Sequence, residues 1–221
     1  MKKEEKAKLI YTPPTPQNTI IAFDLHDVIV KYDYRAIVKT FFKHDKKLKF
    51  FIALLNPFFW KDVIKLKLQK AVPEQFIIQL GKKYKRLTPY IPLGIKIANC
   101  QNPDPRMIEL LKQLKNQGYT LHLFSNIGAT ILQDLKQKFP DIIAYFDNVT
   151  IPSQENGYTR KPYQHAFEHY LAKHVKKDEQ VIFIDDKKRN IKMAEKVGII
   201  GIRFCSPRQL KSEFRKLAII Q

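Results

Sequence analysis

The stretch that decides the fold is Ile20-Ile21-Ala22-Phe23-Asp24-Leu25-His26-Asp27-Val28. Its short apolar run, residues 20–23, ends at an acidic residue, which is typical of a buried strand whose carboxyl end meets a crevice. Two later apolar runs end in the same way, with Ser125-Asn126 after residues 121–124 and Asp185-Asp186 after residues 181–184. Because the carboxyl ends of parallel strands meet at one edge of a sheet, we expect these polar groups to lie together.

Helical and strand patterns alternate from about residue 104 to the end of the chain. Apolar residues at helical spacing, such as Ile108, Leu111 and Leu114, indicate one buried face of a helix. We expect strands at 19–24, 119–124, 180–185 and 199–204, and helices at 107–116, 129–138, 163–174, 189–197 and 207–217. This alternation predicts an α/β fold with a Rossmann-like, doubly wound parallel sheet.

The sequence divides into three predicted parts. Residues 1–18 are expected to form a flexible N-terminal tail, since the proline-rich stretch 12–16 cannot hold a helix or a β-ladder. Residues 19–30 and 103–221 form the predicted Rossmann-like core. The segment 31–102 between them has a helical pattern and carries 16 Lys or Arg against four Asp or Glu. It is therefore predicted to be a basic helical cap inserted after the first strand.

Composition limits the class of protein and its partners. The 221 residues are 44% hydrophobic, enough for a sizeable core, and carry a formal charge of +19. This charge favours an anionic partner. A sequence-specific nucleic-acid partner is not favoured, because 32 of the 40 basic residues are Lys, whereas recognition of bases relies on Arg. The two cysteines form no framework and the N-terminus lacks an apolar signal region, so a cytoplasmic location is expected.

One aromatic run in the cap, Phe50–Trp60, has two interpretations. It is flanked by lysines, which suits peripheral contact with an anionic membrane surface. It is also typical of the core of a small helical domain or of a homodimer contact, and we favour the core interpretation. The chain is expected to be a monomer or a homodimer.

Four segments together resemble the haloacid dehalogenase superfamily of hydrolases and phosphatases. They are Asp24-Leu25-His26-Asp27-Val28, Ser125-Asn126, Arg160-Lys161-Pro162 and Asp185-Asp186. The segments follow the family's order over residues 19–204, with the expected long insert between the first two. The resemblance implies a Rossmann-like core, Mg²⁺ as cofactor and an aspartate that becomes transiently phosphorylated.

The resemblance also assigns roles to individual residues. Asp24 matches the nucleophile, Lys161 the lysine that neutralises nucleophile and phosphate, and Ser125 the hydroxyl that contacts the phosphoryl group. Asn126 follows as a candidate substrate contact. The implied metal ligands are Asp24, Asp186 with its supporting neighbour Asp185, and His26 through its backbone carbonyl. Asn190 fits the spacing of a residue that orders the loop after the fourth motif.

Elementary chemistry explains why such groups must meet. A carboxylate that attacks a phosphate monoester approaches an anion, so a divalent cation and a lysine must cancel the repulsion. Each polar pair also has a plainer interpretation: Asp24 as a turn cap, and Asp185-Asp186 or Ser125-Asn126 as caps of the helices that follow.

His26 departs from the family's phosphatases, which carry a second aspartate at this position as general acid and base. Three interpretations remain open. Histidine performs the proton transfer, as its ordinary pKa permits; the site is slow or only binds; or the chemistry is that of a phosphonatase or dehalogenase. We expect a Mg²⁺-dependent phosphatase-like hydrolase acting on a small phosphorylated or otherwise anionic substrate. The alternative is a catalytically weak protein of the same fold that binds an anionic partner.

Overall fold

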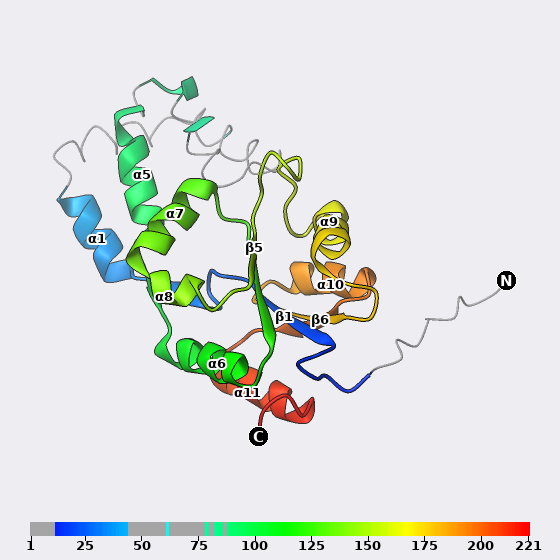
Figure 1. Ribbon diagram of the computed structural model, residues 1–221. Coiled ribbons are helices and arrows are strands. Elements are labelled where there is room, and N and C mark those ends of the chain that lie inside the picture. The colour runs from blue at the N-terminus through cyan, green and yellow to red at the C-terminus, as the bar shows by residue number, and fades with distance from the viewer. Residues whose placement is uncertain (1–11, 44–60, 62–77, 80–81, 86–87) are drawn as a thin grey trace.

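A five-stranded parallel sheet forms the centre of the protein (Figure 1). The computed structural model describes residues 12–43, 61, 78–79, 82–85 and 88–221. The sheet has the order β5-β4-β1-β6-β7. Its strands are β1 (Thr19–Phe23), β4 (Thr120–Phe124), β5 (Asn148–Thr150), β6 (Gln180–Asp185) and β7 (Ile200–Arg203). The predicted α/β class with a parallel sheet is confirmed.

The order of the strands reverses at β1. The chain runs from β1 to β4 and β5 on one side, and then crosses back to β6 and β7 on the other. Phe23 pairs in register with Leu123 of β4 and with Ile184 of β6. The residues that follow these positions therefore gather at one edge of the sheet, at the switch point where α/β folds place their ligands.

Helices cover both faces of the sheet, and β1 shows why. Its side chains alternate, as they do in any strand. Ile21 and Phe23 belong to the core cluster that includes α6 (Pro105–Asn116), α7 (Ala129–Lys138) and α11 (Pro207–Lys216). Ile20 and Ala22 belong to the cluster of α9 (Gln164–His174) and α10 (Lys188–Lys196). A short helix, α8 (Pro140–Ile143), follows α7.

A two-stranded antiparallel ribbon joins this core to the inserted helical region. It pairs β2 (Val30–Tyr32) with β3 (Gln101–Pro103). Between them the structure describes α1 (Tyr34–Phe42), the 3₁₀ turn η1 (Thr88–Tyr90) and α5 (Ile91–Ala98). The predicted insertion of a helical region is confirmed. The division at residues 30/31 and 102/103 stays a prediction, and both of these boundaries fall inside the ribbon.

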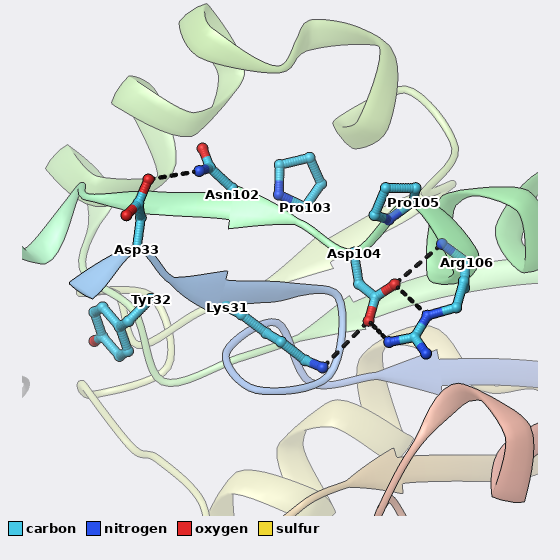
Figure 2. Close-up of a pocket in the computed structure, with 8 residues that line it drawn as sticks. All are labelled: Lys31, Tyr32, Asp33, Asn102, Pro103, Asp104, Pro105 and Arg106. Carbon is cyan, nitrogen blue, oxygen red and sulfur yellow. Dashed lines mark hydrogen bonds and ion pairs between the residues drawn. The ribbon is translucent and has the colours of Figure 1, made fainter. Parts of the chain in front are cut away.

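Two aspartates stand at opposite ends of this ribbon (Figure 2). Asp33 caps α1, because its Oδ1 accepts from the Ala36 N–H, and its Oδ2 accepts from the Asn102 side chain. Asp104 caps α6 by accepting from the Arg106 N–H. The ribbon borders an open cavity of about 470 Å³, and the aspartates that follow β1 and β6 do not line it.

Most predicted elements are found within one or two residues. The helix predicted at 107–116 begins at Pro105, because Asp104 caps it and proline suits a first helical position. The segment 12–18 packs against the core: Pro14 is buried, and the Gln180 side chain donates to the Thr12 carbonyl. This differs from a flexible tail that extends to residue 18.

The aromatic run Phe50–Trp60 lies outside the described residues, so its two interpretations stay predictions. None of the helices that the structure describes is long and apolar enough to cross a membrane.

Candidate active site

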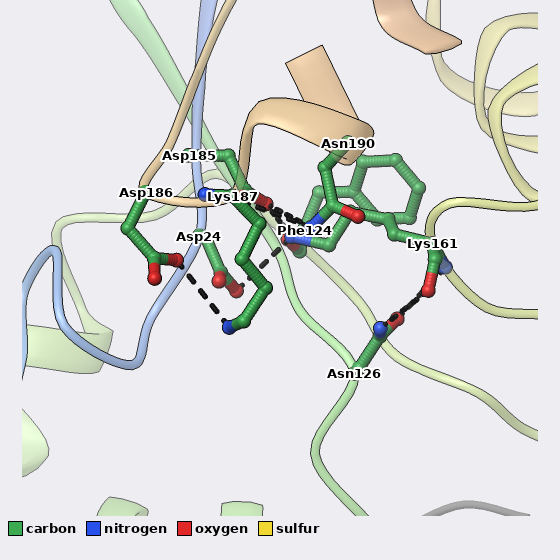
Figure 3. Close-up of polar contacts among 8 residues, drawn as sticks. All are labelled: Asp24, Phe124, Asn126, Lys161, Asp185, Asp186, Lys187 and Asn190. Atoms are coloured by element: carbon green, nitrogen blue, oxygen red, sulfur yellow. Dashed lines mark hydrogen bonds and ion pairs between the residues drawn. The ribbon is translucent and has the colours of Figure 1, made fainter. Parts of the chain in front are cut away.

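Three carboxylates converge at the carboxyl edge of the sheet, as the sequence predicted (Figure 3). Asp24, Asp185 and Asp186 each offer an oxygen, and these oxygens lie within 4.8 Å of one another. The Asp24 N–H donates to the Ile184 carbonyl at 2.8 Å, which ties the start of the loop after β1 to β6. Asp24 and Asp185 are buried, whereas the Asp186 side chain is 25% exposed.

Lys161 places a buried positive charge between two of these carboxylates. Its Nζ lies 3.0 Å from Asp24 Oδ1 and 2.7 Å from Asp185 Oδ2, and it donates to the Phe124 carbonyl at 2.6 Å. An ammonium group has three hydrogens, so these three acceptors use all of them. The rings of Phe124 and Phe183 also lie 5.2 and 4.8 Å from Nζ, which adds cation–π attraction. The Lys161 ammonium group is therefore held in place by its two ion pairs, its hydrogen bond to the Phe124 carbonyl and its ring contacts together.

The charges of this cluster set the protonation of Asp24. Burial raises the pKa of Asp24, but the charges of Lys161 and Lys187 and the hydrogen bond from Lys161 hold it below the ordinary value. Asp24 is therefore a carboxylate at neutral pH, which is the nucleophilic form.

The pKa of Asp186 is shifted in the opposite direction to that of Asp24. Burial raises its pKa above the ordinary value, and the negative charges of Asp185 and Asp24 act in the same direction against the opposing charge of Lys187. Crowded carboxylates of this kind are relieved by a hard divalent cation with oxygen ligands.

Asp185 is held in one orientation by its hydrogen bonds. Its Oδ1 accepts from the Lys187 N–H at 2.8 Å, and Asn190 Nδ2 lies 2.9 and 2.8 Å from Oδ1 and Oδ2. Asp24 and Asp186 face fewer competing donors than Asp185. Three carboxylates at this spacing suit Mg²⁺, which binds hard oxygen ligands, so the donor set fits the implied cofactor.

Ser125 and Asn126 lie beside this cluster, at the end of β4. Ser125 is buried, and its Oγ has no hydrogen-bond partner among the residues that the structure describes. A buried hydroxyl without a partner is uncommon and is available to a ligand. Asn126 donates to the Lys161 carbonyl at 2.8 Å and accepts from the Lys161 N–H at 2.9 Å. This pairing positions Lys161, while a substrate contact by Asn126 stays a prediction.

His26 lies in the loop after β1, near the carboxylates. Its half-buried ring stacks on Tyr32 of the ribbon, with 5.5 Å between centroids and 28° between planes. Burial lowers the pKa of His26, and Asp24 and Asp27 only partly oppose this. The imidazole is therefore neutral at neutral pH, the form suited to accept a proton. Asp27 is exposed and has a φ of 62°, and its N–H donates to the Val30 carbonyl at 2.8 Å.

Lys187 belongs to the cluster, although sequence reasoning missed it. Its Nζ lies 3.3 Å from Asp186 Oδ1. Burial lowers its pKa, but the charges of Asp24, Asp186 and Asp185 outweigh burial and raise it. The only signal in the sequence was its place directly after the acidic pair, among 32 lysines. Tyr32 was missed because the ribbon that carries it was not predicted.

Comparison with known proteins agrees with this geometry. Residues 19–198 match the haloacid dehalogenase-like hydrolase family. The chain belongs to this family. Among curated relatives of this hydrolase, the sesquiterpene phosphatase astK of Aspergillus oryzae is 27% identical over 196 residues, which cover 88% of this chain and 94% of that protein.

Solved structures of family members share the fold at low identity. The family enzyme bt-2542 of Bacteroides thetaiotaomicron is 17% identical with a TM-score of 0.64, over 90% of this chain and 98% of that one. YfnB of Bacillus subtilis, solved bound to magnesium, is 15% identical with a TM-score of 0.61, over 91% and 99%. These likenesses confirm the family's fold, with a helical region inserted between β2 and β3.

Proposed function

We propose that this hydrolase is a Mg²⁺-dependent phosphatase that acts on a phosphorylated small molecule through a phospho-aspartate at Asp24. The observation that carries the proposal is the placement of Asp24, ion-paired with the buried Lys161 and within 4.8 Å of the Asp185 and Asp186 oxygens. The sesquiterpene phosphatase that is 27% identical supports a phosphate ester of a small molecule as substrate. The magnesium bound to YfnB supports the choice of cofactor.

The proposed reaction has two steps, and each residue of the site has a defined role in them. The Asp24 carboxylate attacks phosphorus and forms a new P–O bond, while the bond to the leaving oxygen breaks and that oxygen takes a proton from the solvent. Water then attacks the phosphorus of the acyl phosphate, which releases inorganic phosphate and restores Asp24. Mg²⁺, when held by Asp24, Asp186 and Asp185, would supply neutralisation of the phosphoryl charge. Ser125 would donate its unused hydrogen bond to a phosphoryl oxygen.

His26 is the proposed proton acceptor of the second step. Its neutral imidazole suits the removal of a proton from the attacking water. Tyr32 holds the ring from the ribbon, so the position of His26 depends on how the ribbon sits on the core.

Hydrolysis of p-nitrophenyl phosphate with and without Mg²⁺ tests the proposal. The wild type is expected to turn over only with Mg²⁺, and Asp24→Asn is expected to lose turnover by roughly a thousandfold or more. Asp178→Asn is the matched control, because it makes the same change at an exposed aspartate outside the carboxylate cluster, and it is expected to leave turnover unchanged. Turnover that survives Asp24→Asn would exclude Asp24 as nucleophile.

Two substitutions at His26 separate its interpretations. His26→Ala is expected to slow turnover, and unchanged turnover would remove its catalytic role. A gain of activity in His26→Asp would show that the histidine limits an otherwise ordinary phosphatase site. Mg²⁺ binding without any turnover in all three proteins would favour the alternative of a protein that only binds an anionic partner.

A further inference from the structure

Two lysines face the three carboxylates, and they are held very differently (Figure 3). Lys161 has three acceptors within 3.0 Å of Nζ, and its side chain is 1% exposed. The Lys187 ammonium contacts Asp186 at 3.3 Å, and its side chain is 42% exposed. Lys161 is thus a fixed part of the site, whereas the Lys187 ammonium group can leave its carboxylate at low cost.

The backbone of Lys187 stays in place when its side chain moves. Its N–H donates to Asp185 Oδ1, and the residue stands at the N-terminal boundary of α10. In Figure 3 the side chain turns back from this anchor, so that its ammonium group lies on the same side as the carboxylates of Asp186 and Asp24. Rotation of the side chain alone would move the charge between these carboxylates and the solvent-facing side of the site.

The contact between Lys187 and Asp186 competes with metal coordination. A divalent cation on Asp24 and Asp186 would draw on the same group of oxygens, and the two positive charges would repel at such short range. The released ammonium group would remain close to the site, because its backbone is anchored. A phosphate dianion that enters the site would then be the nearest negative charge available to it.

We propose that Lys187 is an exchangeable cation, which Mg²⁺ displaces from Asp186 and which then binds the incoming phosphate group. The proposal rests on the proposed function, since it assumes the metal site at Asp24 and Asp186. It assigns Lys187 two opposite effects: it weakens the binding of Mg²⁺ and strengthens the binding of phosphate.

Calorimetric titration of the full chain tests both effects in Lys187→Gln. Mg²⁺ alone is expected to bind roughly threefold to tenfold more tightly than in the wild type, because its competitor is gone. Inorganic phosphate, titrated at saturating Mg²⁺, is expected to bind more weakly by a similar factor. Lys188→Gln is the matched control, because it removes the same charge from the next, exposed residue. It is expected to leave both affinities near those of the wild type.

If Lys187 only held its loop in place, Lys187→Gln would change the two affinities in a different pattern. Both affinities would fall together if the substitution only disturbed the loop, and this result would overturn the proposal. Unchanged Mg²⁺ affinity or unchanged phosphate affinity would also overturn it. Lys187→Arg, which keeps the charge, is expected to retain the binding of phosphate. A wild type that binds no Mg²⁺ would refute the metal site itself and, with it, the proposed function; normal Mg²⁺ binding that Lys187→Gln leaves unchanged would refute only the exchange.

Discussion

Ser125 is buried, yet its hydroxyl lacks a hydrogen-bond partner among the described residues. Ser125→Ala is therefore expected to leave the free energy of unfolding unchanged or to raise it by up to about 1 kcal/mol, since no bond is lost. The same change is expected to lower kcat/KM by roughly tenfold to a hundredfold, because a charge-assisted hydrogen bond to phosphate is lost. Urea unfolding and steady-state kinetics measure the two effects.

Ser206 is the matched control for this substitution. Its Oγ accepts from the Gln209 N–H and caps α11. Ser206→Ala is expected to cost about 1 kcal/mol of stability and to leave turnover unchanged. A loss of stability in Ser125→Ala equal to that of Ser206→Ala would contradict the view that its hydroxyl is kept for a ligand.

Lys161 is the residue whose removal should damage both stability and activity. Lys161→Met leaves the buried Asp24 and Asp185 without their shared counter-charge, so the free energy of unfolding is expected to fall by about 3 kcal/mol at pH 7. The loss should shrink as the pH falls, because protonation removes the unpaired charges. Chemical denaturation between pH 4 and pH 7 measures this dependence.

An exposed lysine provides the comparison. Lys173 is half-exposed and pairs with Glu155, and Lys173→Met is expected to change stability by less than about 1 kcal/mol. A loss for Lys161→Met as small as this would show that the carboxylates find other compensation.

At the level of elements, Asp104 connects the ribbon to α6. It is buried, and hydrogen bonds from Arg106 and Lys31 outweigh burial and lower its pKa from 3.8 to about 2. Because its pKa is lower in the folded state, ionised Asp104 stabilises the folded protein at pH values above the ordinary pKa of the carboxyl group. This stabilisation is lost as the pH falls from about 4 to about 2. Asp104→Asn keeps the cap but removes the charge, so it is expected to cost about 1 kcal/mol at pH 7 and nothing near pH 2.

The cost expected for Asp104→Asn is small because the two basic side chains that pair with Asp104 are exposed. The Arg106 and Lys31 side chains are 64% and 49% exposed, so solvent screens their attraction. Asp104→Ala also removes the cap of α6 and is expected to cost about 1 kcal/mol more. Unfolding free energies of the two variants at pH 7 and near pH 2 separate the charge from the cap. A cost for Asp104→Asn that does not change with pH would contradict the assigned pKa.

Whether a helix or strand could be predicted from the sequence depends on whether its own residues show its surroundings or only its pairing with a distant segment forms it. β6 and α7 were predicted at their observed bounds, because a buried strand and an amphipathic helix show their environment in their own residues. The ribbon was missed, since β2 and β3 become strands only by pairing with each other across about 70 intervening residues. β5 was not predicted, because its three residues are too few to show the alternation of a strand.

For the whole molecule, the parallel sheet made the site predictable. Once residues 20–23, 121–124 and 181–184 were recognised as strands, their following residues had to meet at one edge, and they do. Side-chain partners were not predictable in this way. That Asn126 holds the Lys161 backbone, and that Lys187 turns back to Asp186, depends on loop conformations that no periodicity encodes.

The net charge of +19 gives a prediction for the molecule as a whole. An anionic substrate is attracted by this charge, and salt screens the attraction. Raising NaCl from about 50 mM to about 500 mM at fixed Mg²⁺ is expected to lower kcat/KM by roughly threefold or more, mainly through KM. Thermal unfolding at both salt concentrations confirms that the protein stays folded. A kcat/KM that does not respond to salt would show that the basic surface does not face the substrate's path.

The central position of β1 has a consequence for biosynthesis. This strand leaves the ribosome before its two neighbours in the sheet, β4 and β6, which are translated about 100 and 160 residues later. Until then the apolar side chains of Ile20, Ile21 and Phe23 have no sheet to join, and an unpaired strand of a nascent chain is prone to aggregate. The strand that presents Asp24 is thus synthesised well before the strands that pair with it, so nascent chains of this hydrolase should depend on chaperones until β6 has emerged.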